Sequence, residues 1–152
     1  MDRIDKENYY LDIAQTVQER STCLRKRYGA IIVRNDEIVS TGYNGAPAGV
    51  STCVERGECL RKKLGIPSGT RHEMCYAVHA EQNAIIQAAK LGVNIDGSTL
   101  YCTHQPCILC AKMIVNAGIV RVVYHSGSPD DFALDIFKEA RVLVERYSES
   151  ED

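Results

Sequence analysis

Two short segments of this chain carry residue types that could bind a metal ion and use it. One contains His79 and Glu81, and the other contains Cys107 and Cys110 directly after Pro106. One imidazole and two thiolates give Zn²⁺ three protein ligands, and a tetrahedral zinc with three protein ligands keeps its fourth position for water, as catalytic zinc sites do. The residue types and their spacing therefore predict a catalytic zinc held by His79, Cys107 and Cys110.

The carboxylate of Glu81 is left free to move protons. Two thiolates cancel the charge of Zn²⁺, so the bound water is acidified less than by three neutral ligands, and a nearby base becomes more important. We expect Glu81 to take a proton from this water as it attacks a ring carbon that bears an amine, and to pass the proton to the ring nitrogen and the departing ammonia. The alternatives are a structural zinc, which would need a fourth protein ligand, and a reduced Cys-x-x-Cys pair in the core.

Both segments are expected at the start of a helix. Residues 79–91 have a helical pattern that ends at Gly92, and residues 106–117 have another, with Pro106 at the first helical position. Cys107 and Cys110 would then lie on one face of the first turn, where the helix dipole favours thiolates. Because residues two apart do not face each other in a helix, His79 must lie at or just before its first turn if Glu81 is also to reach the metal.

The rest of the pattern predicts a single domain over residues 1–152 of the α/β class. Hydrophobic periodicity and turn residues indicate a three-layer α/β/α sandwich around a five-stranded mixed sheet, whose later strands are parallel and joined by helical crossovers. The expected elements are a helix over 6–20, strands over 29–33, 38–43, 99–103, 119–124 and 141–144, and a helix over 130–140. Residues 44–76 read as a long irregular insertion, and loops of that length are usually functional.

Composition narrows the class of protein. The chain is 45% hydrophobic and 25% charged, as soluble domains are, and its formal net charge of -2 gives no basic surface for a nucleic-acid polymer or an anionic membrane. No apolar run approaches the ~18–20 residues of a membrane span, and the first residues lack a secretory pattern. We therefore expect a cytoplasmic protein, in which the seven cysteines serve metal binding or catalysis more than disulfides.

Three motifs together resemble the deoxycytidylate (dCMP) deaminase family, including its late-competence operon members. They are HAEQNAI at 79–85, TGYNGAP at 41–47 and PCILC at 106–110; the first and last contain the H-x-E…P-C-x-x-C signature already known from zinc-dependent nucleobase deaminases. The resemblance runs from about residue 23 to residue 124. Free-nucleoside cytidine deaminases usually have Cys at position 79, and tRNA and guanine deaminases typically lack the Gly-Tyr-Asn-Gly segment, so both resemble the chain less.

The resemblance implies a cytidine-deaminase-like fold and hydrolysis of dCMP to dUMP and ammonia, which feeds thymidylate synthesis. It also implies a homohexamer, often activated by dCTP and inhibited by dTTP. By the same resemblance, Asn44 lies beside the nucleotide, and the loop with Tyr43, Asn44 and Gly45 takes part in nucleotide or effector binding. Gly42 and Gly45 would let the backbone approach a ligand closely, although a simple turn after a strand is the alternative.

Three more residues are candidates for substrate binding. Ala80 lies inside the His-Ala-Glu motif, and Tyr124 could pack against the base or be a core aromatic. The phosphate must be met by cations or backbone N–H groups, and Arg25 in the basic cluster 25–27 is the candidate for that contact.

Four further cysteines lie in or beside the insertion: Cys23, Cys53, Cys59 and Cys75. Some dCMP deaminases hold a second zinc partly through cysteines at the positions of Cys23 and Cys53, with other ligands from a variable stretch where this chain departs from them. We expect Cys59 and Cys75 to complete a structural zinc here, with His72 as a substitute ligand, because so polar an insertion has no core of its own. The alternative is four small buried thiols.

The leading hypothesis is therefore a zinc hydrolase that acts on dCMP. A deaminase of another free base or nucleotide is the alternative among enzymes. A non-catalytic zinc module linked to DNA uptake is the alternative outside them, but such a module has no need of Glu81.

Overall fold

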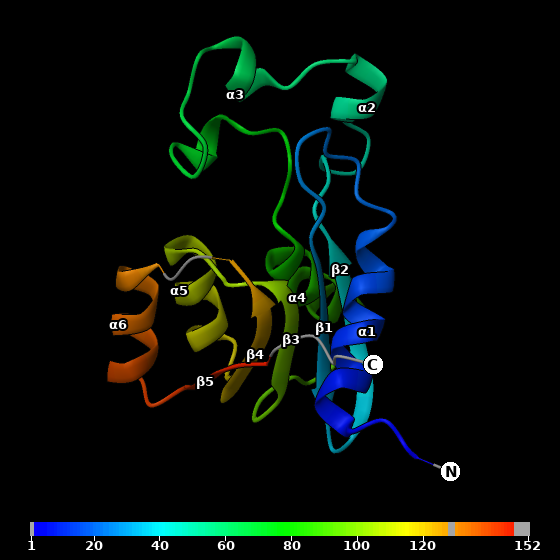
Figure 1. Cartoon of the computed structure of the whole chain (residues 1–152), viewed down its shortest axis with the longest axis vertical. Coiled ribbons are helices and arrows are strands. Elements are labelled where there is room, and N and C mark those ends of the chain that lie inside the picture. Colours follow the sequence, from blue (N-terminus) through cyan, green and yellow to red (C-terminus); the bar gives the residue numbers. More distant parts are fainter. Residues whose placement is uncertain (1, 128–129, 148–152) are drawn as a thin grey trace.

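A five-stranded mixed sheet organises the computed structural model of this chain (Figure 1), which describes residues 2–127 and 130–147. The strands lie in the order β2-β1-β3-β4-β5. β1 pairs antiparallel with both β2 and β3, whereas β3, β4 and β5 are parallel. The strand bounds are Gly29–Arg34 (β1), Glu37–Tyr43 (β2), Thr99–His104 (β3), Arg121–Ser126 (β4) and Leu143–Arg146 (β5). The predicted mixed sheet with parallel later strands is confirmed.

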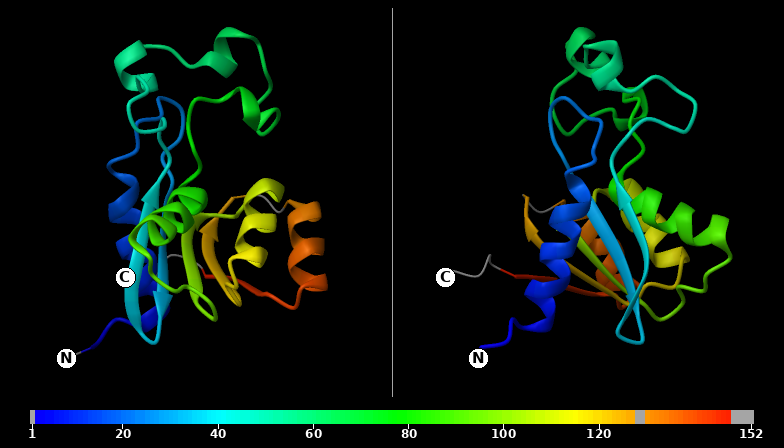
Figure 2. Two further views of the ribbon diagram at one scale, coloured as in Figure 1. Left: turned by 180° about the vertical axis from the view of Figure 1, so that it is seen from behind. Right: turned by 90° about the vertical axis from the view of Figure 1, so that its right-hand side faces the viewer.

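Helices cover both faces of the sheet and make three layers (Figure 2). Helix α1 (Lys6–Gln18) packs on one face, where Ile31 of β1 belongs to its core. Helices α4 (Ala80–Leu91), α5 (Ile108–Asn116) and α6 (Asp131–Glu139) pack on the other face, where Ile32 belongs to theirs. Successive residues of a strand point to opposite faces, so β1 serves both cores. The three-layer α/β/α fold is confirmed, and no helix in the described part of the chain could span a membrane.

The predicted bounds of these elements differ from the observed ones by no more than two residues. The difference that bears on the site concerns Pro106, which was expected at the first position of its helix and instead precedes the N-cap. Helix α5 begins at Ile108, and Cys107 is its N-cap with an extended backbone (φ -77°, ψ 174°). The N–H of Ile108 donates to Oδ2 of Asp130 at 3.0 Å, so the start of α5 is fixed by a residue from a distant loop.

The insertion stands above the sheet as an arch (Figure 1). It is mostly irregular, as predicted, but contains three short helical segments: α2 (Cys53–Arg56), α3 (Leu60–Lys63) and the 3-10 turn η1 (His72–Met74). A bridge between Gly45 and Val78 joins its two ends, with N···O distances of 3.1 and 2.7 Å.

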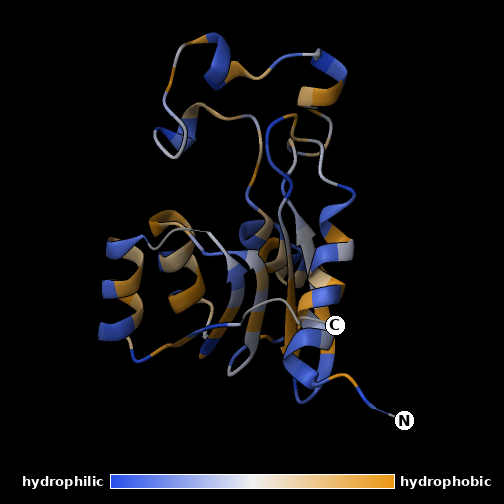
Figure 3. Ribbon diagram, viewed as in Figure 1, coloured by the Kyte–Doolittle hydropathy of each residue, from blue (hydrophilic) through white to orange (hydrophobic). Residues whose placement is uncertain are grey.

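Hydrophilic and hydrophobic segments alternate along the arch (Figure 3). Between residues 46 and 76, Cys53 is the one buried side chain. The prediction that the insertion has no hydrophobic core of its own is therefore confirmed.

The structure gives Gly42 a different role from the one expected. A Cβ atom at this position would lie 2.4 Å from the carbonyl oxygen of Ala80 and 2.4 Å from the nitrogen of Ala84. Gly42 therefore lets β2 approach the backbone of α4, rather than a ligand. This close contact sets the position of the helix turn that carries Glu81.

Candidate active site

The three predicted metal ligands meet where α4 and α5 begin. His79 is the N-cap of α4, with an extended backbone, and Cys107 is the N-cap of α5. Nδ1 of His79 lies 3.2 Å from Sγ of Cys110 and 3.5 Å from Sγ of Cys107, and the two sulfurs are 3.7 Å apart. The position of His79 just before its helix, as predicted, is what lets its ring face both thiols. One imidazole nitrogen and two sulfurs this close are a donor set that suits zinc.

The hydrogen bonds within this cluster also favour binding of a cation. Hydrogen bonds from the Cys110 thiol and from His79 lower the pKa of Cys107 to about 3, although burial opposes this shift. The bond to Cys107, together with burial, raises the pKa of Cys110. These contacts favour the thiolate form of Cys107, which is the form that binds Zn²⁺.

Glu81 lies in the first turn of α4 and is 6% exposed. Burial raises the pKa of its carboxyl group, and a hydrogen bond from the Cys110 thiol acts in the opposite direction. The group of metal-ligating atoms in the described residues does not include Glu81. A buried carboxyl with a raised pKa beside a metal site, but outside its ligand set, is suited to proton transfer.

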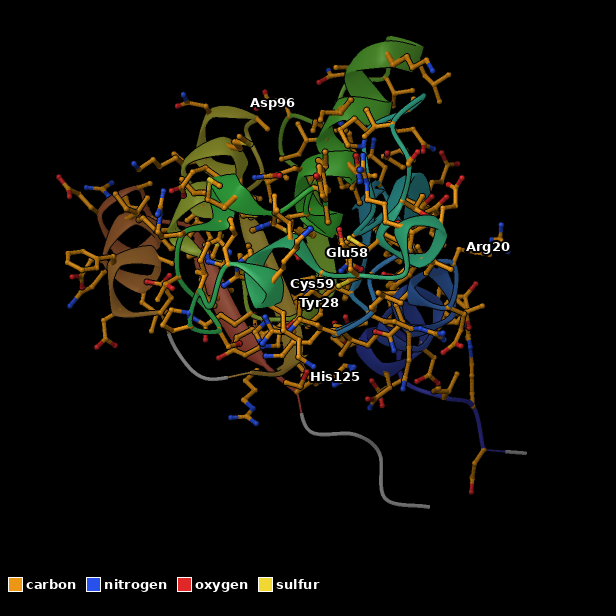
Figure 4. All side chains as sticks on the ribbon, turned by 90° about the horizontal axis from the view of Figure 1, so that it is seen from above. Arg20, Tyr28, Glu58, Cys59, Asp96 and His125 are labelled. Atoms are coloured by element: carbon orange, nitrogen blue, oxygen red, sulfur yellow. The ribbon has the colours of Figure 1, made fainter. Side chains whose placement is uncertain are left out.

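A cavity of about 440 Å³ opens in front of this cluster, a size suited to a small-molecule ligand. Its floor includes Glu81 and His79. Its other walls come from the loop before β1, the end of β3 and the insertion. Tyr28, directly before β1, and Cys59 of the insertion therefore line the same cavity, and both are labelled in Figure 4. The rings of Tyr28 and His104 contact each other on one wall, tilted by 40° with their centroids 4.7 Å apart.

Asn44 lines the cavity, as expected, but its side chain is already bonded to the loop over residues 21–28. Its Oδ1 accepts from the hydroxyl of Ser21 at 2.6 Å and from the N–H of Tyr28 at 2.9 Å, while its Nδ2 donates to the carbonyl of Lys26 at 2.9 Å. Asn44 therefore holds the loop that carries Arg25, which also lines the cavity.

Four other candidates are absent from the cavity wall that the described residues form. Tyr124 and Ala80 are buried in the core under α4–α6, because the register of β4 points the Tyr124 side chain to that layer. Tyr43 is 39% exposed, and its carbonyl accepts from Nδ2 of Asn83 at 2.8 Å. Gly45 is paired with Val78 at the base of the insertion.

Arg61 and Tyr28 were not predicted as cavity residues, whereas His104 was considered near the pocket from its place in the sequence, and the structure puts all three on the cavity wall. Arg61 lies in the insertion and faces the cavity. No hydrophobic period or motif surrounds it, so nothing in the sequence pointed to this placement.

The four remaining candidate metal ligands come near one another without forming a tight cluster. Burial raises the pKa of Cys53, and the nearby sulfur atoms of Cys75, Cys23 and Cys59 raise it further. Within residues 2–127 and 130–147, the His79 group is the one set of three or more potential ligand atoms that all lie within 4.8 Å of each other.

His72, the substitute ligand, lies beside the first site instead. Its ring packs edge-on against His79 with 5.1 Å between the centroids.

Comparison with known proteins gives consistent matches. Residues 4–126 match the family model described as the cytidine and deoxycytidylate deaminase zinc-binding region. The chain is 40% identical over 133 residues to the deoxycytidylate deaminase of Mycobacterium phage D29, covering 84% of this chain and 100% of the phage protein. It is 38% identical over 147 residues to ComE operon protein 2 of Bacillus subtilis, covering 96% and 73%.

A longer relative and a solved structure extend these matches. The deoxycytidylate deaminase of Schizosaccharomyces pombe is 33% identical over 142 residues, which cover 93% of this chain but only 44% of the yeast protein, so the chain spans less than half of that relative. The crystal structure of the cyanophage S-TIM5 dCMP deaminase in complex with dCMP and dUMP superposes with a TM-score of 0.77 at 33% identity, covering 95% of this chain and 100% of the phage chain.

Proposed function

The chain belongs to the cytidine and deoxycytidylate deaminase family, and on that basis we propose that it hydrolyses dCMP to dUMP and ammonia. The observation that carries the proposal is the meeting of His79, Cys107 and Cys110 beside the buried Glu81, at the floor of a cavity of nucleotide size. The S-TIM5 relative, with a similar fold, holds both dCMP and dUMP, the substrate and product of this reaction.

The residues divide the chemistry between them. When bound by His79, Cys107 and Cys110, zinc would supply a Lewis acid and an acidified water at the reacting carbon. Glu81 would carry two protons of the attacking water in turn, the first to the ring nitrogen and the second, released as the new C=O bond forms, to the departing amine, which leaves as ammonia. The cavity wall of Tyr28 and His104 would bound the space in which the ring is held.

We expect a strong preference for the nucleotide over the nucleoside. A charge-assisted contact to a phosphate is worth roughly 1.5–3 kcal/mol, and several would act together, so kcat/KM for dCMP should exceed that for deoxycytidine by far more than tenfold. The test is ammonia release from dCMP, CMP, deoxycytidine and guanine by the purified zinc protein. Faster release from another substrate would assign a different deaminase activity, and no release from any would favour a non-catalytic zinc module.

We also propose that Cys23, Cys53, Cys59 and Cys75 hold a structural zinc. Two of the sulfurs already accept backbone N–H bonds: Cys23 from Arg25 and Cys75 from Ala77, each at 3.4 Å. Burial alone would raise the pKa of Cys59, but the N–H groups of the α3 first turn and the side chain of Arg25 bring it below its usual value. These donors stabilise sulfur in the form that binds zinc.

We further propose a cytoplasmic homohexamer that responds to dCTP and dTTP at the loop with Tyr43, Asn44 and Gly45. Seven free thiols suit a reducing compartment, and the α4–α5 layer exposes Ile86 (52%) and Met113 (47%), apolar side chains that another copy of the chain could cover. Light scattering should give six chains, and dCTP should lower the KM for dCMP. A monomer whose kinetics neither nucleotide changes would contradict both points.

A further inference from the structure

Arg61 lies in the part of the cavity wall that the insertion forms. It lines the cavity together with Ser68, Gly69 and His72, while His79 and Glu81 lie at the floor. Cys59, labelled in Figure 4, precedes it by two residues at the N-cap of α3. The metal ligands and Glu81 already account for the chemistry at the ring, so the reaction itself does not require a cation at this position.

The guanidinium is fixed by a turn of the insertion itself. Its Nη2 donates to the carbonyl oxygens of Pro67 at 2.9 Å and Thr70 at 2.6 Å. The N–H of Thr70 also donates to the Pro67 carbonyl, at 3.3 Å, so that turn 67–70 closes around the arginine. The tip of the turn is Ser68 and Gly69, and Gly69 has the left-handed φ of +78° that favours glycine. Both tip residues face the same cavity.

The Nε atom of the Arg61 guanidinium does not take part in these bonds. Nε of Arg61 is buried and has no hydrogen-bond partner, and no carboxylate of the described residues forms an ion pair with this side chain. A buried donor without a partner is costly and rare, which indicates that a ligand supplies the acceptor.

The other cations of the insertion differ from Arg61. Arg56 lies over the Tyr76 ring at 4.0 Å, Lys63 pairs with Glu58 at 3.4 Å, and Arg71 pairs with Glu73 at 3.1 Å.

Arg61 is also close to the reaction site. Arg61 and His72 line the same cavity, and the ring of His72 packs edge-on against that of His79 with 5.1 Å between the centroids. By contrast, the side chain of Arg25, the cation expected from the sequence to meet a phosphate, lies beside the sulfur of Cys59 and lowers its pKa. Lys26 also lines the cavity, but Arg61 is the cation there with a buried Nε that has no hydrogen-bond partner among the described residues, so it can offer that donor to an anionic group.

We propose that Arg61 and the tip of turn 67–70 bind the 5′-phosphate of the nucleotide, so that the insertion decides between nucleotide and nucleoside. The inference rests on the proposed deaminase function and names the residue that sets its substrate class. An arginine side chain and the N–H and hydroxyl groups at the tip of a glycine turn are typical donors to phosphate oxygens.

The test compares two substrates in one variant. In the zinc-loaded protein, Arg61→Gln should lower kcat/KM for dCMP about ten- to a hundredfold, chiefly through KM, and leave kcat/KM for deoxycytidine within about twofold. Lys62→Gln is the matched control, since it removes a cation from the same helix that is exposed and outside the cavity wall, and it should change neither value. Arg61→Lys, which keeps the charge with a different set of donors, should fall between.

Inorganic phosphate provides a second measurement that does not depend on nucleotide turnover. It should inhibit deamination of deoxycytidine by the wild type and inhibit the Arg61→Gln variant at least tenfold more weakly. Equal losses on both substrates would show a purely structural role for Arg61, and an unchanged KM for dCMP would assign the phosphate to another group; either overturns the inference. Failure of the wild type to deaminate dCMP in preference to deoxycytidine would instead reject the proposed function.

Discussion

Glu81→Gln is expected to keep its zinc and to lose at least about 10²–10⁴-fold in kcat for dCMP. The amide has nearly the volume of the carboxyl group, so the 6%-exposed site should stay packed. Because Glu81 is outside the group formed by His79, Cys107 and Cys110, its replacement should not remove a metal ligand. The amide cannot accept the proton that the carboxylate would carry through several transfers, so the loss should be at least that of one general acid–base step.

The measurements are kcat from ammonia release and zinc per chain from elemental analysis. Glu139→Gln, which changes an exposed glutamate at the end of α6, is the matched control and should leave both unchanged. A variant that retains zinc and turns over at a near-normal rate would reject the proton-transfer role. Loss of zinc together with activity would show that Glu81 supports the metal site.

The metal site was predictable because its determinants are local. His79 had to precede its helix for Glu81 to share the site, and the structure places it at the N-cap of α4. The prediction for α5 was two residues early at Pro106, because the start of that helix depends on Asp130, which is distant in sequence. Motifs therefore located the ligands, while tertiary contacts fixed the ends of the elements.

The substrate contacts were less predictable because they depend on packing between distant segments. The side chain of Asn44 is bonded to the loop before β1, a partner that sequence spacing does not reveal. Tyr124 faces the core rather than the cavity. Successive residues of a strand point to opposite faces of the sheet, so a one-residue difference in register would reverse the direction of this side chain. Arg61 lies in an insertion without periodicity, where only the closed turn 67–70 gives it a direction.

Removal of the proposed second zinc is expected to have the largest effect on stability. Cys53 is the one buried side chain between residues 46 and 76, and it faces the three other sulfurs, so Cys53→Ser should reduce zinc from two ions per chain to one. Structural zinc sites contribute binding free energies of about 10–16 kcal/mol in small peptides, and this energy becomes folding energy. We therefore expect a lower melting temperature and faster proteolysis within residues 57–71, while His79 and Cys107 retain the catalytic ion.

The consequences for catalysis follow from the chain between Cys59 and Arg61. If the second zinc fixes Cys59, its loss should also release Arg61, which is two residues further on, so the KM for dCMP should rise more than the KM for deoxycytidine. Cys102→Ser is the control, because Cys102 is as deeply buried but lies in β3 within the sheet, and this variant should keep two zinc ions. One zinc per chain in freshly purified wild type, never exposed to chelator, would reject the second site and leave these four cysteines as packed thiols.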